Sequence, residues 1–240
     1  MKIIENTEEK LSFIMEGNES LANAIRRSVL EIPILAIDEV EFYKNDGVLY
    51  DEMIALRLGL VPLKNENLDL PEDCKCKGKG CSNCSINLKL DAKGPLAVTS
   101  GMLKGKADVV YEEIPITELG KDQEISLTAR AVVGKGTQHA KFSPGLVYYS
   151  FTPIIEKVSD AKGKKVIEVS EKEFSEIKKL DKIARDYLDE TVKCGDEIIY
   201  VKPNKEEILF TIESWGQITP KEIFLKAISV LEKNLKEIAK

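Results

Sequence analysis

The sequence predicts an α+β fold with a helix near each end of the chain and a β-rich middle. Three observations predict it: apolar residues repeat every three or four positions near the N-terminus, alternate with polar residues in the middle, and follow a heptad spacing at the C-terminus. The 240 residues fit one large domain or two smaller ones, and 43% hydrophobic residues suffice for a proper core.

The chain begins with a predicted hairpin and a helix. Loose alternation over residues 2–16 indicates two strands joined by a turn at Asn6–Glu9. Asn18 or Ser20 can cap the following helix, and Pro33 ends it. One face of this helix carries an apolar stripe, which consists of Leu21, Ile25, Val29 and Ile32.

The middle of the chain is predicted to be mostly strands. Residues 34–43 are typical of a strand that ends in a turn at Asp46-Gly47, and residues 50–60 are typical of a short helix. A turn at 143–145 precedes a further strand. Between the helix and this turn, short runs of strand-forming residues predict strands at 85–94, 96–105 and 124–136.

The segment 156–195 is the most polar part of the sequence. It is expected to hold a loop at 158–165 and then a charged, weakly amphipathic helical segment that packs lightly at the surface. Two strands joined by a turn at Pro203-Asn204 are expected next, with Trp215 as a core anchor.

The C-terminal helix is the most clearly marked element. Thr219 is the expected N-cap, Pro220 takes the first helical position, and Glu222 completes a capping box. A heptad seam follows, which consists of Phe224, Ile228, Leu231, Leu235 and Ile238. The apolar face is wider than the stripe of about 100° that suits a helix packed only in its own domain. The helix either lies in a groove of its own sheet or also meets a second chain, and the apolar surface otherwise left exposed favours the second arrangement.

Four of the five cysteines form a cluster with the spacing C-x-C-x4-C-x2-C. Its last two cysteines have the spacing of a zinc knuckle, and Gly78 and Gly80 let the loop fold so that four sulfurs can surround one ion. A site with four thiolate ligands has no open position for water, so the pattern predicts a structural zinc ion. The expected ligands are Cys74, Cys76, Cys81 and Cys84.

Two alternatives remain for these cysteines. They could be free or paired as disulfides, or they could hold an iron–sulfur cluster, although no C-x2-C-x2-C run is present. The N-terminus lacks the apolar segment of a signal peptide, and no run of eighteen apolar residues occurs, so we expect a cytoplasmic protein with reduced thiols. The fifth cysteine, Cys194, is expected to be a small, buried or half-buried residue.

No arrangement of residues predicts catalysis in this chain. The only histidine, His139, is expected to hydrogen-bond its neighbours in a loop, and neither a P-loop nor a D-x-D-x-D triplet occurs. Arg26 and Arg27 are either a solvated pair or fixed guanidinium forks for the carboxylates or carbonyls of a partner. The net charge of −6 argues against a protein that wraps nucleic acid by itself, because such binding needs a basic face.

Several motifs resemble one family of transcription proteins. They are ESLANAIRRSVLEIPILAIDEVEF, LRLGLVPL, HAKFSP and the closing FTIESWGQITPKEIFLKAISVLEKNL. The family comprises the D subunit of archaeal RNA polymerase, the third-largest subunit of eukaryotic RNA polymerase II and, more remotely, the amino-terminal domain of the bacterial alpha subunit. The resemblance covers residues 1–155 and 196–240. The cysteine cluster lies where the eukaryotic relative carries its zinc loop, with one extra residue between the second and third cysteines.

The resemblance implies a non-catalytic assembly subunit of DNA-dependent RNA polymerase, a nucleotidyltransferase. It implies a discontinuous α/β dimerisation domain from residues 1–47 and 196–240, with residues 48–155 as an inserted β-rich domain. The first and last helices would pair with those of a smaller subunit, L. The partner-binding residues would then be Leu21, Ile25, Arg26, Arg27, Val29 and the five seam residues. Subunits N and P and the two large catalytic subunits would join this heterodimer, and DNA would be met only in the assembled complex.

One segment departs from the family pattern. Some archaeal relatives carry a ferredoxin-like domain with an iron–sulfur cluster at 156–195, but this chain has only Cys194 there. We therefore expect no iron–sulfur cluster, and a charged helical segment in place of that domain. The alternative function is a stand-alone zinc-dependent nucleic-acid-binding protein, which would need a basic surface near Lys75, Lys77 and Lys79. A hydrolase that uses His139 is a third hypothesis.

Overall fold

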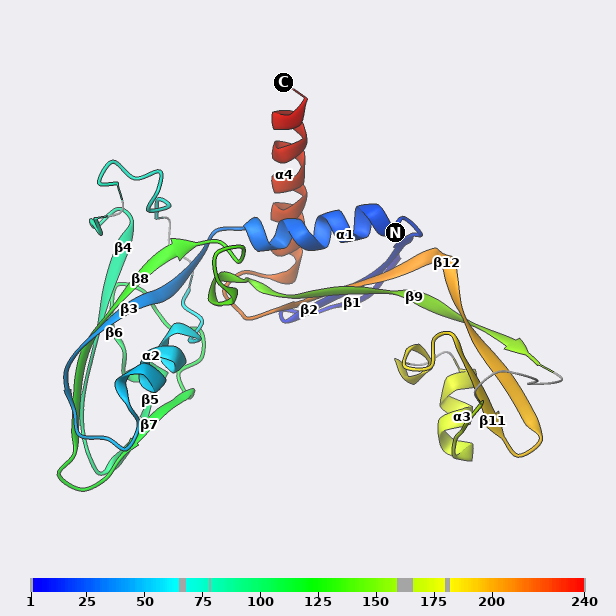
Figure 1. Cartoon of the computed structure of the whole chain (residues 1–240), viewed down its shortest axis with the longest axis horizontal. Coiled ribbons are helices and arrows are strands. Elements are labelled where there is room, and N and C mark those ends of the chain that lie inside the picture. The colour runs from blue at the N-terminus through cyan, green and yellow to red at the C-terminus, as the bar shows by residue number, and fades with distance from the viewer. Residues whose placement is uncertain (1, 65–67, 78, 159–165, 180–181, 240) are drawn as a thin grey trace. The chain divides into compact units, whose positions relative to one another are not determined.

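A computed structural model describes residues 2–64, 68–77, 79–158, 166–179 and 182–239 (Figure 1). The predicted α+β class is confirmed, since strands dominate the middle of the chain and α-helices lie near both ends. Gly78 and most of the loop expected at 158–165 lie outside the described residues.

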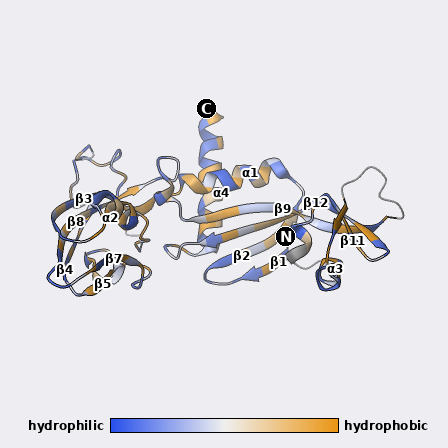
Figure 2. Cartoon of the chain, turned by 60° about the horizontal axis from the view of Figure 1, so that its bottom comes forward, coloured by the Kyte–Doolittle hydropathy of each residue, from blue (hydrophilic) through white to orange (hydrophobic). Residues whose placement is uncertain are grey.

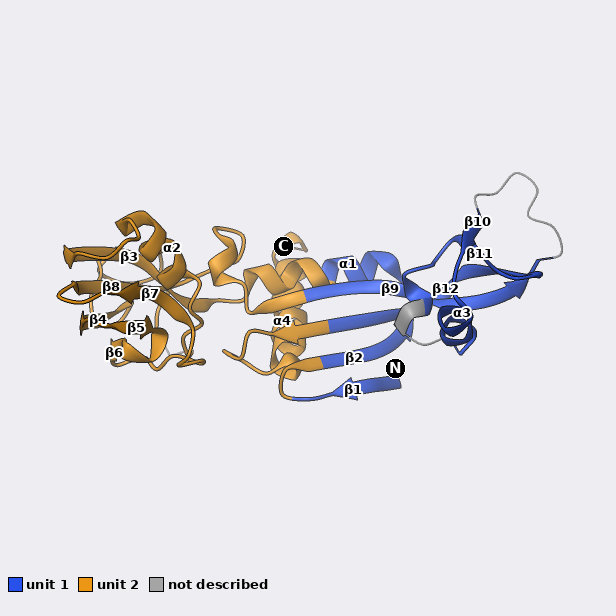
Figure 3. Ribbon diagram, turned by 90° about the horizontal axis from the view of Figure 1, so that it is seen from below, with its two compact units in different colours: residues 1–7, 11–24, 147–211 blue, residues 8–10, 25–146, 212–240 orange. Residues whose placement is uncertain are grey.

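Two compact units make up the chain, and each is assembled from separate segments (Figure 3). One unit contains residues 1–7, 11–24 and 147–211. The other contains residues 8–10, 25–146 and 212–240. Each unit therefore combines residues from near the N-terminus with residues far along the chain.

A four-stranded antiparallel sheet is the frame of the β-rich insertion. Its order is β3-β8-β4-β6, with the bounds Ile34–Asn45, Glu124–Gly134, Ser85–Lys93 and Lys104–Gly105. In β4, Ile86, Leu88 and Leu90 are buried while the residues between them are exposed, as expected of a strand with one face on a core. Strand β3, which the predicted boundaries place entirely in the discontinuous domain, pairs with β8 along its whole length.

A helix and a two-stranded sheet complete the insertion. The helix α2 (Asp51–Gly59) confirms the prediction at 50–60, and the two strands are β5 (Leu96–Thr99) and β7 (Pro115–Leu119), of which β7 was not expected. The single strand expected at 96–105 is wrong. A 3-10 turn separates β5 from β6, because the buried hydroxyl of Ser100 bonds to the backbone of residues 111 and 114 there. Aliphatic side chains from α2 and both sheets form one core cluster.

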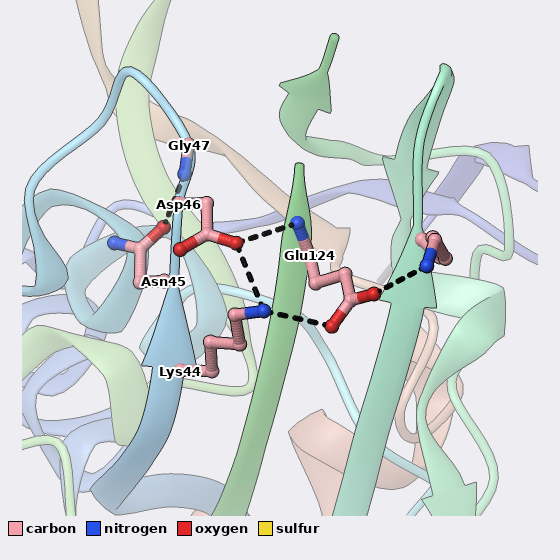
Figure 4. A network of polar contacts seen from close by, with 6 residues as sticks. Lys44, Asn45, Asp46, Gly47 and Glu124 are labelled. Carbon is pink, nitrogen blue, oxygen red and sulfur yellow. Dashed lines mark hydrogen bonds and ion pairs between the residues drawn. The ribbon is translucent and has the colours of Figure 1, made fainter. Parts of the chain in front are cut away.

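Ion pairs fix one end of the sheet (Figure 4). Lys44 Nζ lies 2.8 Å from Glu124 Oε2 and 3.2 Å from Asp46 Oδ2. The backbone N–H of Glu124 donates to Asp46 Oδ2 at 3.2 Å. Lys93 of β4 adds a second cation at 2.7 Å from Glu124 Oε1. The Glu124 carboxylate therefore connects strands β3, β8 and β4.

The second large sheet contains six strands in the order β1-β2-β12-β11-β10, with β9 also paired to β12. Their bounds are Lys2–Asn6, Lys10–Glu16, Glu197–Ser214, Glu190–Cys194, Val166–Glu168 and, for β9, Gly145–Lys157. β1 and β2 form the predicted antiparallel hairpin, and β9 follows the predicted turn at 143–145. Figure 2 shows hydrophobic residues (orange) interspersed with hydrophilic ones along the central strands.

β12 corrects the prediction of two strands joined by a turn at Pro203-Asn204. It is one strand of 18 residues that runs through both positions. Its pairing with β11 ends at Val201, so Pro203, which has no N–H to donate, lies beyond that ladder. The proline therefore coincides with the end of one pairing and not with the end of the strand.

The segment 156–195 is more than a charged helix. Among its described residues, only Glu171–Lys178 forms an α-helix, α3, which is followed by a 3-10 turn at Lys182–Arg185 and accompanied by the parallel pair β10 and β11. The segment does not pack lightly. It shares with β12 a core cluster that consists of Phe174, Ile177, Ala184, Val192, Ile199 and Val201. The prediction missed this cluster because these apolar residues are few and are spread over α3, the 3-10 turn and two strands.

The first long helix is α1 (Glu19–Ser28), and a 3-10 turn, η1 (Val29–Glu31), continues it towards Pro33. The cap is Asn18, whose Oδ1 accepts from the backbone N–H of Leu21 at 3.0 Å. Of the two caps that the sequence offers, the structure therefore uses the first.

The last helix is α4 (Pro220–Ile238), and it begins with the predicted capping box. The backbone N–H of Glu222 donates to Thr219 Oγ1 at 3.3 Å, and the backbone N–H of Thr219 donates to the Glu222 carboxylate at 3.0 Å. Within the described ranges, no helix is both long enough and apolar enough to cross a membrane.

Candidate functional site

The four clustered cysteines lie in a loop that leads into β4. The backbone N–H of Cys74 donates to Leu70 O at 3.0 Å, and the backbone N–H of Cys84 donates to Cys81 O at 3.0 Å. Gly80 has a φ of +82°, a left-handed conformation that favours glycine, and it lets the chain turn into the second pair of cysteines. Local turns therefore direct both pairs of cysteines towards one point.

The four sulfur atoms converge at this point. Cys74 Sγ lies 3.5 Å from Cys81 Sγ, Cys76 Sγ lies 3.4 Å from Cys84 Sγ, and the sulfurs of Cys81 and Cys84 are 3.8 Å apart. All four lie within 4.8 Å of one another. A tetrahedral zinc ion with Zn–S bonds of about 2.3 Å holds its sulfurs roughly 3.8 Å apart. The donor set and its spacing therefore fit zinc, and all four cysteines are free of disulfides.

The pKa values of Cys74, Cys76 and Cys84 are shifted in different directions. The pKa of Cys76 is lowered to about 6, because the backbone N–H of Cys81 and the thiol of Cys84 both donate to its sulfur. The backbone N–H of Cys76 lowers the pKa of Cys74, but the contact with the Cys81 thiol and burial outweigh it and raise that pKa to about 12. Burial is the main cause of the raised pKa of Cys84. A divalent cation between the sulfurs would supply the charge that ionises all four.

The fifth cysteine is separate from this site. Cys194 is half-buried at the end of β11 and packs against the core cluster of the segment 156–195. It therefore takes the structural role that the sequence predicts for it.

α4 buries one stripe against its own fold and leaves a second one open. Pro220, Ile223 and Ala227 are buried. At 100° per residue, the predicted seam lies about 70° around the helix from this buried stripe. The first three seam residues are half-buried, and the exposed fraction is 57% for Leu235 and 84% for Ile238. The seam is therefore open in the isolated chain, and it adjoins the face that holds α4 in place.

The residues at the N-terminal helix that were expected to bind a partner fall into a buried group and an accessible group. Ile25 of α1 and Val29 of the adjoining turn η1 are buried in the chain's own core, whereas Leu21 is exposed. Arg26 is half-buried and Arg27 is exposed. Leu21 and the two arginines are therefore the members of this group that offer side-chain surface to another molecule.

An apolar pocket lies where the sequence pattern indicates none. It has a volume of about 390 Å³, and its walls include Leu60, Tyr111 and Trp215. Trp215 is 46% exposed, so the expectation that it is a core anchor is wrong. The sequence did contain one signal, which is the glycine directly after the tryptophan. In the structure, Gly216 has a φ of +88°, so the chain turns there and does not continue as a buried strand.

His139 has the local role that the sequence predicts. Its Nδ1 accepts from the backbone N–H of Lys141 at 3.2 Å, and the Lys141 ammonium lies 2.7 Å from Asp38. Neither contact joins a base to a nucleophile. In the described part of the chain, nothing around this histidine supports hydrolysis.

The chain is similar to known proteins along its whole length. The family described as the RNA polymerase Rpb3/RpoA insert domain matches residues 39–145. The DNA-directed RNA polymerase II subunit rpb3 of Dictyostelium discoideum is 33% identical, over 99% of this chain and 93% of that protein. The DNA-directed RNA polymerase subunit Rpo3 of Archaeoglobus fulgidus is 32% identical, over 100% of this chain and 96% of that protein. Rpo3 of Pyrococcus furiosus is 34% identical, over 96% and 92%.

Proposed function

Because the chain belongs to the family of DNA-directed RNA polymerase subunits that includes Rpo3 and rpb3, we propose that it assembles the polymerase through the apolar seam of its last helix. It is a non-catalytic assembly subunit of that nucleotidyltransferase. Its contribution is to present preorganised apolar surface, and the catalytic groups belong to other chains.

The open seam of α4 is the observation that carries this proposal. Its five residues lie beside the buried stripe and not within it, so covering them needs no rearrangement of the chain's own core. Complete burial of one Leu or Ile side chain is worth roughly 1.5–3 kcal/mol, so a partner that covers the seam gains several such increments. The heptad spacing suits a partner that also presents a helix.

The partner in this proposal is the smaller subunit L. It meets the seam of α4 and the exposed Leu21 of α1, and the guanidinium groups of Arg26 and Arg27 bind its carboxylates or carbonyls. Ile25 and Val29 are buried within this chain, so in this proposal they hold α1 in position and do not contact the partner. The heterodimer is the platform that subunits N and P and the two large catalytic subunits join. DNA is met only through the assembled complex.

A structural zinc ion belongs to the same proposal. Cys74, Cys76, Cys81 and Cys84 would hold it, and the ion would supply four bonds that lock the loop onto the start of β4. Four protein ligands fill a tetrahedral shell, so the site positions backbone and binds no substrate. The absence of an iron–sulfur cluster stays an expectation from the lone Cys194 of the segment 156–195.

Co-purification with subunit L tests the assembly role. The double variant Ile228→Glu with Leu235→Glu places two carboxylates on the seam, and we expect it to abolish capture by tagged L. Both side chains are at least partly accessible, so the variant should still fold, which circular dichroism checks. Normal capture of this variant would refute the seam as the interface.

A matched control uses the opposite face of α4. Ser229→Glu with Lys233→Gln changes the net charge by the same amount, and both residues are exposed. At 100° per residue these positions lie roughly 140–180° around the helix from the middle of the seam. We expect this control to bind L like the native chain, so equal loss in both variants would indicate a general effect of charge.

A further inference from the structure

The residue that carries a further inference is Arg130 on β8. Its position in the sheet is fixed by register, because it pairs with Glu39 of β3 on one side and with Asn87 of β4 on the other. Its Nη2 lies 2.7 Å from Glu39 Oε1. The guanidinium is therefore anchored by a central strand of the insertion, and the cysteine loop leads directly into the neighbouring strand.

The other edge of this guanidinium lies against the cysteine loop at Gly80. A Cβ atom built on Gly80 would fall 2.5 Å from Arg130 Nη1 and 3.6 Å from its Cζ, so the space that a side chain would fill is occupied by the arginine. The φ of +82° independently favours glycine at this position. Gly80 directly precedes Cys81, so the arginine supports the backbone at the first cysteine of the knuckle.

The polar contacts of Arg130 are incomplete for a partly buried cation. Its side chain is 29% exposed, while the carboxylate side chain of Glu39 is 66% exposed and screened by water. Among the residues that the structure describes, the buried Arg130 Nε atom has no hydrogen-bond partner. A buried donor that lacks a partner is costly, so a nearby negative charge would be favourable at this place.

The cysteine site would provide such a charge if it held a metal ion. Four thiolates around a divalent cation carry a net charge of about −2, and outer groups that offset or hydrogen-bond such ligands tune metal affinity. Lys75, Lys77 and Lys79 also lie in the loop, but all three are exposed, so water screens their charges. Arg130 differs from them because it reaches the loop from the sheet, where pairing with β3 and β4 fixes its backbone.

We propose that Arg130 is a positioning residue for the metal site: it holds the loop at Gly80 and supplies positive charge beside the four thiolates. This inference rests on the proposed zinc centre. In this role the sheet of the insertion pre-shapes the loop, and the metal then joins the two cysteine pairs.

Zinc affinity of the purified chain tests the inference, measured by competition with a chromogenic chelator. Replacement of groups outside the ligand set typically weakens metal binding 10–100-fold, and we expect a loss in that range for Arg130→Met, which keeps much of the packing but not the charge. Arg130→Lys keeps the charge and should recover part of the loss. Visible absorption of the chain loaded with Co²⁺ reports whether the tetrahedral thiolate geometry persists in each variant.

Two results would overturn the role of Arg130. One is native zinc affinity in Arg130→Met. The other is an equal loss in Arg130→Met and Arg130→Lys, which would leave packing as the whole effect. Glu39→Gln is the control, because it removes the other ion-pair partner but keeps the guanidinium, and it should bind zinc at least as tightly as the native chain. Absence of zinc binding in the native chain itself would instead refute the metal centre on which the inference rests.

Discussion

The side-chain amide of Asn234 on α4 donates to both carboxylate oxygens of Glu31, at 3.1 and 3.2 Å. Glu31 ends the 3-10 turn η1, which continues α1. The bond therefore joins two residues that are 203 positions apart in sequence. Because Asn234 lies on the same side of α4 as the buried stripe, this polar pair fixes the rotation of α4 about its axis, and with it the direction in which the seam faces.

Removal of this pair should loosen the C-terminal half of α4. A hydrogen bond to a charged group contributes on the order of 1–3 kcal/mol, so Asn234→Ala should lower the free energy of unfolding by about 1–2 kcal/mol. Urea unfolding followed by the fluorescence of Trp215, the only tryptophan, measures the change. Lys233→Ala, at the exposed neighbouring position, is the control and should change little. No difference between the two variants would show that the pair does not hold the helix.

The start of α4 provides a second test. Thr219→Ala removes the side chain that accepts the backbone N–H of Glu222, and loss of such a cap typically costs about 0.5–2 kcal/mol. Thr219→Ser keeps the hydroxyl and should retain most of the stability. The denaturant midpoints of the two variants measure this difference in stability. Equal midpoints would mean that the hydroxyl cap contributes nothing.

The network around Glu124 predicts a dependence of stability on pH. Its hydrogen bonds with Lys44 and then Lys93 lower the pKa of the carboxyl from 4.5 to about 2. The unfolded chain therefore takes up this proton first as the pH falls, so the contribution of Glu124 is complete above about pH 5 and is lost as the pH falls from 4.5 towards 2. Glu124→Gln should be less stable than the native chain at pH 6, and the difference should shrink at pH 3. A difference that stays the same at both pH values would contradict the network.

Metal content distinguishes the clustered cysteines from Cys194. Elemental analysis should find one zinc ion per native chain and none in Cys81→Ser, which removes one ligand of the knuckle. Cys194→Ser is the matched control and should keep its zinc. Removal of zinc by a chelator should lower the melting temperature of the native chain and of this control, but not that of Cys81→Ser. Loss of zinc in both serine variants would mean that the site has been assigned to the wrong residues.

Much of the fold could be predicted where neighbouring residues decide the structure. The capping box at Thr219 and Glu222 depends on residues three positions apart, and the alternation in β4 depends on the period of a single strand. The elements that prediction missed depend on pairing. β7 became a strand through β5, and the core cluster within 156–195 formed through β11 and β12, so neither left a strong local pattern.

The candidate site shows the same division. Spacing alone identified the four cysteines, since only their separation along the loop and the chemistry of sulfur were needed. Spacing could not identify Arg130, which lies far along the chain and reaches the loop only because β8 pairs with β4. Nor could it show that Ile25 and Val29 belong to the chain's own core while the seam of α4 stays open.

The sequence by itself determined the capped helices, the cluster of four cysteines and the excess of apolar residues at the C-terminus, because each follows from side chains a few positions apart. Only the tertiary structure decided that β12 passes through Pro203 as one strand, that Trp215 is exposed, and which face of α4 is left exposed. These features depend on contacts between distant residues, whose free energies a local pattern does not contain. The rotation of α4, fixed by Asn234 and Glu31, is the clearest case.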